Sequence, residues 1–373
     1  MDIPVPRETV LKAAQARHAL HALAEISMRE AETRAFMAAF LRDNTSFGVV
    51  DRGPWLYAFR ERDVPGEEGP VAFVADLDAL PIDETVSLPW ASAHPGVSHK
   101  CGHDGHMAAL LGLALALEGK PLSRDVYLIL EPGEEIGAGG EMCAALIAEK
   151  NISEVYAFHN RPGYPEGAVV CRGGQIQCAS MGLRLFFEGK TSHASESEAG
   201  RNPAPAMARL VIAMDDFTRS RGEGVWCTVV GMKAGEGDFG ISPGLGEVSL
   251  TLRSERQEDL DALRVFAGQT ARHLADKDGL KVTAEERDVF PETCNDCAAA
   301  EKILARAGKA GFPVIRPDRP WRASEDFGWY TRKCPGAMFY IGCGEEWPAL
   351  HTAAYDFNDA ILPRAIEMFV SLI

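Results

Sequence analysis

The chain has 373 residues, about twice the length of a typical single domain, so two domains with separate cores are expected. Charged residues make up 25% and hydrophobic residues 46% of the composition, which excludes a disordered or fibrous chain. The formal net charge of −16 disfavours a nucleic-acid or anionic-membrane partner, and we expect a small-molecule substrate.

Two further features concern the cellular location. The amino-terminal residues Met1-Asp2-Ile3-Pro4 lack the order of a secretory signal, and the longest apolar run, residues 107–117, is too short to span a bilayer. The nine cysteines are an odd number at irregular spacing, which indicates reduced thiols rather than a disulfide framework. A cytoplasmic location is therefore expected.

The first part of the chain predicts alternating strands and helices. Residues 71–76 are typical of a buried strand, and its end delivers Asp76 and Asp78 into a loop. The pattern continues with a helix from about residue 106, a strand at 125–130, a helix from about residue 140 and a strand at 155–158. This alternation is typical of a parallel α/β sheet, in which ligands bind beyond the carboxyl ends of the strands.

A different pattern begins at about residue 181. It predicts a strand at residues 183–188, a helix after Pro203, and two strands at 225–233 and 247–253. A helix at 257–276 and a strand at 281–288 follow. This βαββαβ order is typical of a ferredoxin-like domain. We therefore expect an α/β protein with a discontinuous first domain, residues 1–180 and 290–373, and an inserted α+β domain, residues 181–289.

Metal-ligating residue types are concentrated in His99-Lys100-Cys101-Gly102-His103-Asp104-Gly105-His106, at a junction between a loop and a helix. Cys101 and His103 are spaced so that a thiolate and an imidazole can occupy neighbouring positions on a metal, with Asp104 and His106 as supporting residues. The alternative is a polar loop that caps the following helix.

Two adjacent carboxylates, Glu134 and Glu135, follow the strand at 125–130. They would repel each other unless a cation or a proton offsets their charge. With a metal present, one carboxylate can bind the ion and the other can accept a proton from a water that the ion has made acidic. The alternative is a pair of acidic residues that open a helix and are favoured by its dipole.

Two isolated histidines complete the candidate set. His159 follows the predicted strand at 155–158, and His351 follows the turn-rich segment Gly342-Cys343-Gly344. Each alone is more typical of a structural histidine. Together with the two clusters above, they are candidate metal ligands.

Several segments occur in the order seen in the M20 metallopeptidases, which the chain resembles from about His21 to its last helix. The closest resemblance is to the subgroup of N-acyl-amino-acid, hippurate and auxin-conjugate amidohydrolases. The segments are Asp76-Leu77-Asp78-Ala79-Leu80-Pro81, Lys100-Cys101-Gly102-His103-Asp104-Gly105-His106, Pro132-Gly133-Glu134-Glu135, His159, Gly189-Lys190-Thr191-Ser192-His193-Ala194, Ser324-Glu325-Asp326-Phe327 and the segment around His351.

The resemblance implies two divalent metal ions per subunit, zinc or manganese in the first place and cobalt or nickel as other options. It implies that Glu134 is the general base and that Asp78 orients the site. The implied ligands are Cys101 as the bridge, Glu135 and His351 at one ion, and His103 and His159 at the other.

The resemblance also implies that the inserted domain is a lid and a homodimer surface. His193 would stabilise the oxyanion, commonly from the partner subunit, and Arg253 would bind a substrate carboxylate. From the residues alone, His193 is equally a structural histidine and Arg253 equally a solvated strand residue.

The chain departs from the family pattern at Val74, where a basic residue is usual, and at Lys100, where a small residue is common. It departs also at Glu196, Glu198 and Gly240. Every metal-ligand position of the family pattern is filled. These departures therefore concern the choice of substrate rather than the metal site.

The expected reaction is hydrolysis of the amide bond of an N-acyl amino acid or a dipeptide-like substrate. Two alternatives stay open: a metal-binding homologue without catalysis, and an aminohydrolase that releases ammonia from an aromatic amine.

Overall fold

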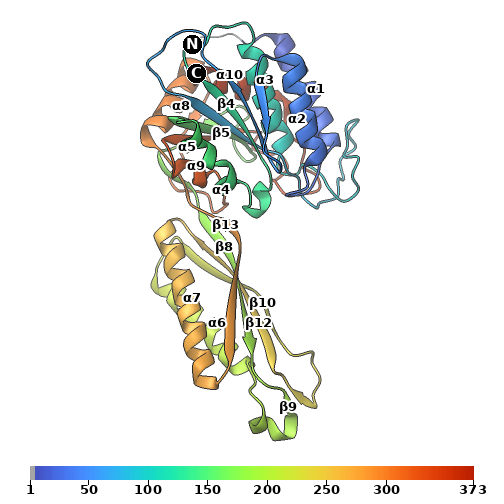
Figure 1. The fold of residues 1–373 in the computed structure, drawn as a ribbon, viewed down its shortest axis with the longest axis vertical. Helices are drawn as coiled ribbons and strands as arrows, with labels where there is room; N and C mark the ends of the chain where they lie inside the picture. Colours follow the sequence, from blue (N-terminus) through green and yellow to red (C-terminus); the bar gives the residue numbers. More distant parts are fainter. Residues whose placement is uncertain (1–4) are drawn as a thin grey trace. The chain divides into compact units, whose positions relative to one another are not determined.

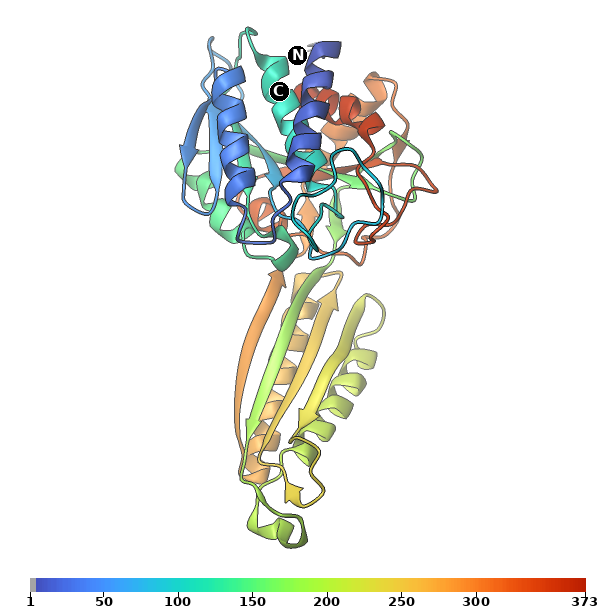
Figure 2. The same ribbon diagram turned by 90° about the vertical axis from the view of Figure 1, so that its right-hand side faces the viewer.

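The structure of the chain is a computed structural model that describes residues 5–373. It contains two compact units, each described by itself (Figures 1 and 2). The first unit comprises the chain up to Ile176, Thr293–Arg319 and Asp326–Ile373, and the second comprises Gln177–Glu292 and Pro320–Glu325. The segment Met1-Asp2-Ile3-Pro4, from which the lack of a secretory signal is inferred, lies outside the described residues.

The first unit is built on an eight-stranded sheet in the order β1-β2-β4-β3-β5-β16-β6-β15. The bounds are β1 Gly48–Asp51, β2 Leu56–Arg60, β3 Val71–Asp76, β4 Val126–Glu131, β5 Glu154–Arg161, β6 Val169–Val170, β15 Val314–Ile315 and β16 Gly336–Gly342. The central strands β4, β3, β5 and β16 run parallel, in agreement with the alternating sequence pattern.

The sheet is mixed rather than wholly parallel, because β2 pairs antiparallel with both β1 and β4, and β16 pairs antiparallel with β6. The connection between β1 and β2 is a tight turn in which the Arg52 N–H donates to the Trp55 carbonyl at 2.9 Å. A connection this short joins only antiparallel strands.

The helices of the first unit are α1 Arg7–Ala22, α2 Ala31–Asn44, α3 His103–Leu117, α4 Gly140–Cys143, α5 Ala145–Glu149, α8 Cys297–Lys309, α9 Gly328–Thr331 and α10 Leu362–Ser371. Helix α3 is buried on all sides and packs against α1, α10 and β3 (Figure 1). It begins three residues before the predicted start at residue 106. The reason is Gly102, whose φ of 95° turns the chain and whose carbonyl accepts hydrogen bonds from the Gly105 and His106 N–H groups.

The second unit contains a four-stranded antiparallel sheet in the order β10-β12-β8-β13. Its strands are β8 Ala179–Glu188, β10 Val225–Ala234, β12 Leu245–Ser254 and β13 Lys281–Phe290, and its helices are α6 Ala204–Ser220 and α7 Gln257–Asp278. Both helices cover one face of the sheet (Figure 2), and alternate residues of β8 are buried in a separate core. The chain order is the predicted βαββαβ, and just before α6 the Asn202 side chain accepts a hydrogen bond from the Ala204 N–H at 2.9 Å.

The second unit also includes Pro320–Glu325, a segment that the sequence analysis assigns to the first domain. Backbone pairing accounts for this difference. The Cys178 N–H donates to the carbonyls of Trp321 and Ala323 at 3.2 and 3.0 Å, so the segment lies against the strand that opens the second unit.

The remaining elements are short. Strand β7 Gly174–Gln177 pairs with β14 Thr293–Asn295, and β9 Ser192–His193 pairs with β11 Ile241–Ser242. The 3-10 helices are η1 Glu134–Ile136, η2 Ala194–Ala199 and η3 Asp359–Ile361. Along residues 5–373, the helices that are long enough to cross a membrane are too polar to do so, and the apolar ones are too short.

Candidate metal centre

The predicted ligands of the first unit converge where its parallel strands end. β3 ends at Asp76 and β4 ends at Glu131, so the loops that follow them open at the same edge of the sheet. The candidate residues come from separate segments: Cys101 from the loop before α3, His103 from the first turn of α3, Glu134 and Glu135 from η1, His159 from β5 and His351 from the loop after β16.

The candidate ligands form two groups with one member in common. Ligand atoms of Cys101, His103 and His159 lie within 4.8 Å of one another. Those of Cys101, Glu135 and His351 do the same. The thiol sulfur is therefore placed to contact two ions, one in each group.

The distances between donor atoms suit metal coordination. Cys101 Sγ lies 3.5 Å from His159 Nε2 and 3.4 Å from His351 Nε2, and His351 Nε2 lies 3.4 Å from Glu135 Oε1. Metal–ligand bonds of about 2.0–2.3 Å in a tetrahedral site separate the ligand atoms by about 3.3–3.8 Å. The geometry therefore fits a small divalent ion in each group.

Two donor atoms lack other partners. His103 Nε2 and Glu135 Oε1 are buried, and neither makes a hydrogen bond of normal geometry within the described part of the chain. Burial raises the pKa of Glu135 to about 7. Burial would lower the pKa of His103, but the Cys101 thiolate and Asp78 raise it well above its ordinary value. Both groups therefore bind a proton more readily than usual, and a divalent metal would satisfy both atoms in place of protons.

Asp78 orients two of the ligands. Its side chain lies 3.2 Å from His103 Nδ1, and it accepts hydrogen bonds from the Glu135 N–H at 3.1 Å and the Ser27 hydroxyl at 2.6 Å. Burial would raise the pKa of Asp78, but these hydrogen bonds together with the charge of His103 outweigh burial and hold that pKa below its ordinary value. An ionised Asp78 leaves His103 Nε2 directed away, toward the metal position.

His106 and Asn160, which the sequence analysis does not place in the catalytic set, form a second supporting network. His106 lies 2.7 Å from Asn160 Oδ1 and 3.2 Å from Asp76 Oδ2. The Asn160 amide donates to the Cys101 carbonyl at 3.1 Å and to the Tyr355 hydroxyl at 2.7 Å. Its position directly after His159 is the only sequence signal that points to it.

The imidazole of His159 is suited to binding as a neutral ligand. It is buried, and burial together with the nearby His106 and His103 lowers its pKa well below the ordinary value. Its Nδ1 lies 2.7 Å from the Asn160 carbonyl, which places the ring proton on Nδ1 and the lone pair on Nε2, the atom that faces the Cys101 sulfur at 3.5 Å.

Glu134 lies beside the ligands without belonging to the Cys101 groups. It is 5% exposed, and its Oε2 lies 3.8 Å from His103 Nε2. Gly133, at φ 65°, makes the turn that separates Glu134 from β4. Ligand atoms of His103, Glu134 and Glu135 also lie within 4.8 Å of one another, so both carboxylates stand at the donor groups.

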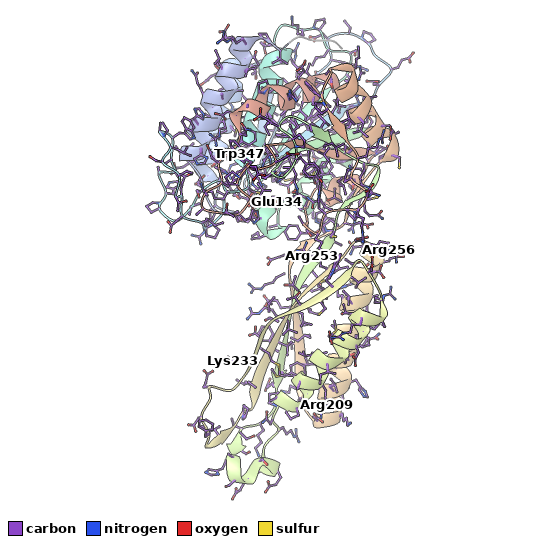
Figure 3. All side chains as sticks on the ribbon, turned by 180° about the vertical axis from the view of Figure 1, so that it is seen from behind. Glu134, Arg209, Lys233, Arg253, Arg256 and Trp347 are labelled. Carbon is purple, nitrogen blue, oxygen red and sulfur yellow. The ribbon has the colours of Figure 1, made fainter. Side chains whose placement is uncertain are left out.

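The other two predicted site residues, His193 and Arg253, belong to the second unit. His193 is exposed on β9, and its Nδ1 lies 2.7 Å from the Ser195 hydroxyl. Arg253 donates to the Arg322 carbonyl and, at 2.7 Å, to the Ser324 hydroxyl. Figure 3 labels Glu134 in the first unit and Arg253 in the second. Their roles in catalysis and substrate binding stay predictions.

Behind the ligands lies a buried pair of acids, Glu131 and Asp326. The Tyr330 hydroxyl donates to Glu131, and the Gly140 N–H donates to Asp326 at 2.9 Å. Burial and then repulsion by Asp326 raise the pKa of Glu131 well above its ordinary value, and burial raises the pKa of Asp326 to about 7. The pair therefore keeps a proton at neutral pH.

The comparisons with known proteins agree with this geometry. The sequence pattern of peptidase family M20/M25/M40 matches residues 72–373. The N-acetyl-L-cysteine deacetylase of Bacillus subtilis is 30% identical over 94% of this chain and 84% of its own length. The N-acetyldiaminopimelate deacetylase of Exiguobacterium sibiricum is 27% identical over 95% of this chain and 97% of its own.

Among solved structures, a dinuclear metal binding peptidase from the M20 family of Bacillus subtilis has the same fold. Its TM-score is 0.81 at 23% identity, with 98% of each chain covered. The α/β fold with a βαββαβ second unit and the thiolate-centred donor groups thus define a metal-dependent amidohydrolase. The chain belongs to peptidase family M20/M25/M40.

The buried acid pair predicts how stability depends on pH. The ordinary pKa of a Glu carboxyl is 4.5, and the folded value of Glu131 is raised, so the folded state retains a proton that the unfolded chain releases. Stability therefore falls as the pH rises above about 4.5 toward the raised pKa values. Glu131→Gln needs no proton, and we expect it to lose less stability between pH 5 and pH 8, by about 2 kcal/mol.

Urea unfolding of the metal-loaded protein at both pH values measures this difference. Glu149→Gln, which alters an exposed pair with Arg52, is the matched control and should follow the wild type. If the wild type and Glu131→Gln lost the same stability between pH 5 and pH 8, the pair of Glu131 and Asp326 would hold no proton.

Proposed function

We propose that this enzyme hydrolyses the amide bond of a small N-acyl amino acid with a water activated between two metal ions. The observation that carries the proposal is the pair of donor groups that share Cys101, with the Glu134 carboxylate beside them. The names of the relatives support the substrate class, because two of them are deacetylases of N-acetylated amino acids.

In the proposed centre, each residue has a distinct task. Cys101 would be a ligand of both ions, Glu135 and His351 would complete one position, and His103 and His159 would complete the other. When bound, two divalent ions polarise the scissile carbonyl and make a coordinated water acidic near neutral pH. Thiolate, imidazole and carboxylate ligands suit zinc, manganese, cobalt and nickel, with zinc or manganese as our first choice.

Glu134 moves the proton. Its carboxylate accepts the proton of the attacking water and afterwards donates it to the amine nitrogen as the carbon–nitrogen bond breaks. Asp78 holds His103 and the backbone of Glu135 in place throughout, so the ligands are positioned before the substrate arrives. Burial of Glu134 strengthens its interaction with the nearby cations.

The reaction class is tested by turnover of a substrate panel with defined metals. After reconstitution with zinc, manganese, cobalt or nickel, the protein should release carboxylate and free amino acid from N-acetyl and N-benzoyl amino acids, and a chelator should abolish the activity. Release of ammonia from an aromatic amine, without amide cleavage, would point to an aminohydrolase. Two bound ions with no turnover of any panel member would mean a metal-binding protein.

The base assignment predicts a separation between metal binding and turnover. Glu134→Gln should keep both ions and lose about 10²–10⁴-fold in kcat, because an amide cannot accept the proton of water. Glu135→Gln is the matched neighbour and should lose metal, because it replaces a proposed ligand. Elemental analysis and kcat of both variants decide the point, and near-normal kcat in Glu134→Gln would refute the assignment.

We further propose that the active enzyme is a cytoplasmic homodimer in which His193 of one subunit stabilises the oxyanion at the site of the other. His193 is exposed, whereas all proposed metal ligands belong to the first unit. The nine free cysteines are compatible with a reducing compartment.

Mixing two inactive variants tests the sharing of sites. In a heterodimer of Glu134→Gln and His193→Ala, one site carries both defects and the other carries neither. With random subunit exchange, roughly a quarter of wild-type activity should return if the sites act independently. Failure to recover activity, in a mixture whose exchange is verified by mass spectrometry, would mean that His193 serves its own chain or has no catalytic task.

A further inference from the structure

Lys100 precedes the proposed bridging ligand and is fully buried. Its ammonium donates to Glu84 Oε1 at 2.7 Å and to the Tyr355 carbonyl at 2.8 Å. Its own carbonyl accepts a hydrogen bond from the His351 N–H at 2.8 Å. One residue thus holds both ends of the segment 351–355, which is about 250 residues away in sequence.

The position of His351 depends on such backbone contacts. Its side chain is 51% exposed, so packing does little to fix the imidazole. Its φ of 61° lies in the left-handed region, which is unfavourable for a residue with a side chain and persists only where the surroundings enforce it. The contacts from Lys100 are among the interactions that enforce it.

The charge of Lys100 is compensated. Burial would raise the pKa of Glu84, but hydrogen bonds from Lys100 and from His21 outweigh it and hold that pKa below its ordinary value. His21 lies 2.8 Å from Glu84 on one side and 2.8 Å from Asp104 on the other. Asp104 in turn pairs with the buried Arg17 at 2.8 Å. The ammonium is therefore held in a chain of alternating charges that extends from α1.

The segment next to Glu84 also contacts the His351 loop. The Thr85 N–H donates to the Ala353 carbonyl at 3.1 Å, between the two points that Lys100 holds. Since the ammonium binds Glu84 and Tyr355 at once, it joins the loop that contains Glu84 to the loop that carries His351. A small residue at position 100 would keep the backbone contact to His351 and lose this link.

We propose that Lys100 is a positioning residue that sets His351 against Cys101, so that the affinity of the Cys101–Glu135–His351 position for its metal ion depends on the Lys100 ammonium. The inference rests on the proposed two-metal centre and not on the identity of the substrate. Residues that orient metal ligands from outside the coordination sphere typically change metal affinity by about 10–100-fold.

The test is metal binding by Lys100→Met, which keeps the length of the side chain and removes its charge. Cobalt titration followed by absorption, together with elemental analysis after gel filtration, measures the two affinities. We expect one ion at wild-type affinity and the other bound at least about tenfold more weakly. Turnover should return toward the wild-type kcat at saturating metal.

Lys302→Met is the matched control, because Lys302 also pairs with a carboxylate, Glu154, at 3.0 Å but touches no proposed ligand. It should bind both ions as the wild type does. Two ions at wild-type affinity in Lys100→Met would overturn the inference and leave the proposed function standing. Failure of the wild type itself to bind two ions would instead overturn the proposed function.

Two double variants separate positioning from mere loss of charge compensation. Lys100→Met with Glu84→Gln leaves no unpaired carboxylate and serves also if Lys100→Met alone fails to fold. Continued weak binding of one ion supports positioning, and restored affinity would attribute the effect to Glu84. In a His351→Ala background, Lys100→Met should change the remaining affinity less than about twofold, because the two residues act through one position. If Lys100→Met weakened metal binding in the His351→Ala background as much as it does in the wild type, Lys100 would act through a residue other than His351.

Discussion

Compensation of negative charge governs the carboxyl edge of the large sheet. Six carboxyl groups are buried or nearly buried there: Asp76, Asp78, Glu131, Glu134, Glu135 and Asp326. Burial of an ionised carboxylate is costly unless a cation, a proton or several hydrogen bonds offset its charge. Each solution is used in a different place. Asp78 relies on hydrogen bonds, Glu131 and Asp326 retain a proton, and Glu134 and Glu135 lie at the donor groups proposed to bind the metals.

This division explains why neighbouring acids take different roles. Glu131 and Glu135 are four residues apart, yet one faces a tyrosine hydroxyl and the other faces the Cys101 thiol and His351. The first is neutralised within the protein and stabilises the turn after β4. The second lies 3.4 Å from His351 Nε2 and belongs to a candidate donor group with Cys101.

The sequence indicates several residues that the structure brings together, but few of the contacts that support them. Cys101, His103, Glu134 and Glu135 are recognisable because scarce, reactive residue types recur at short spacing after predicted strands. The parallel centre of the sheet and the βαββαβ unit follow from periodicity. The antiparallel edge depends instead on a tight turn near Arg52.

Other features depend on contacts between distant segments, which local patterns do not reveal. The hydrogen bonds of Lys100 to residues near position 355, and those of Arg253 to residues 322 and 324, are of this kind. The same holds for the inclusion of 320–325 in the second unit. A polar residue on a predicted strand or loop gives no indication of a partner that is far away in sequence.

The single sulfur common to both donor groups has a consequence for the redox behaviour of the enzyme. A thiolate that is oxidised to a sulfenic acid no longer binds metal as it did, so one oxidation event at Cys101 would disable both ion positions at once. Bound ions would in turn shield the sulfur by engaging its lone pairs, and the residue is only 7% exposed. Loss of metal and sensitivity to peroxide are thus coupled through one atom, and an enzyme starved of metal would also be the one most readily inactivated by oxidants.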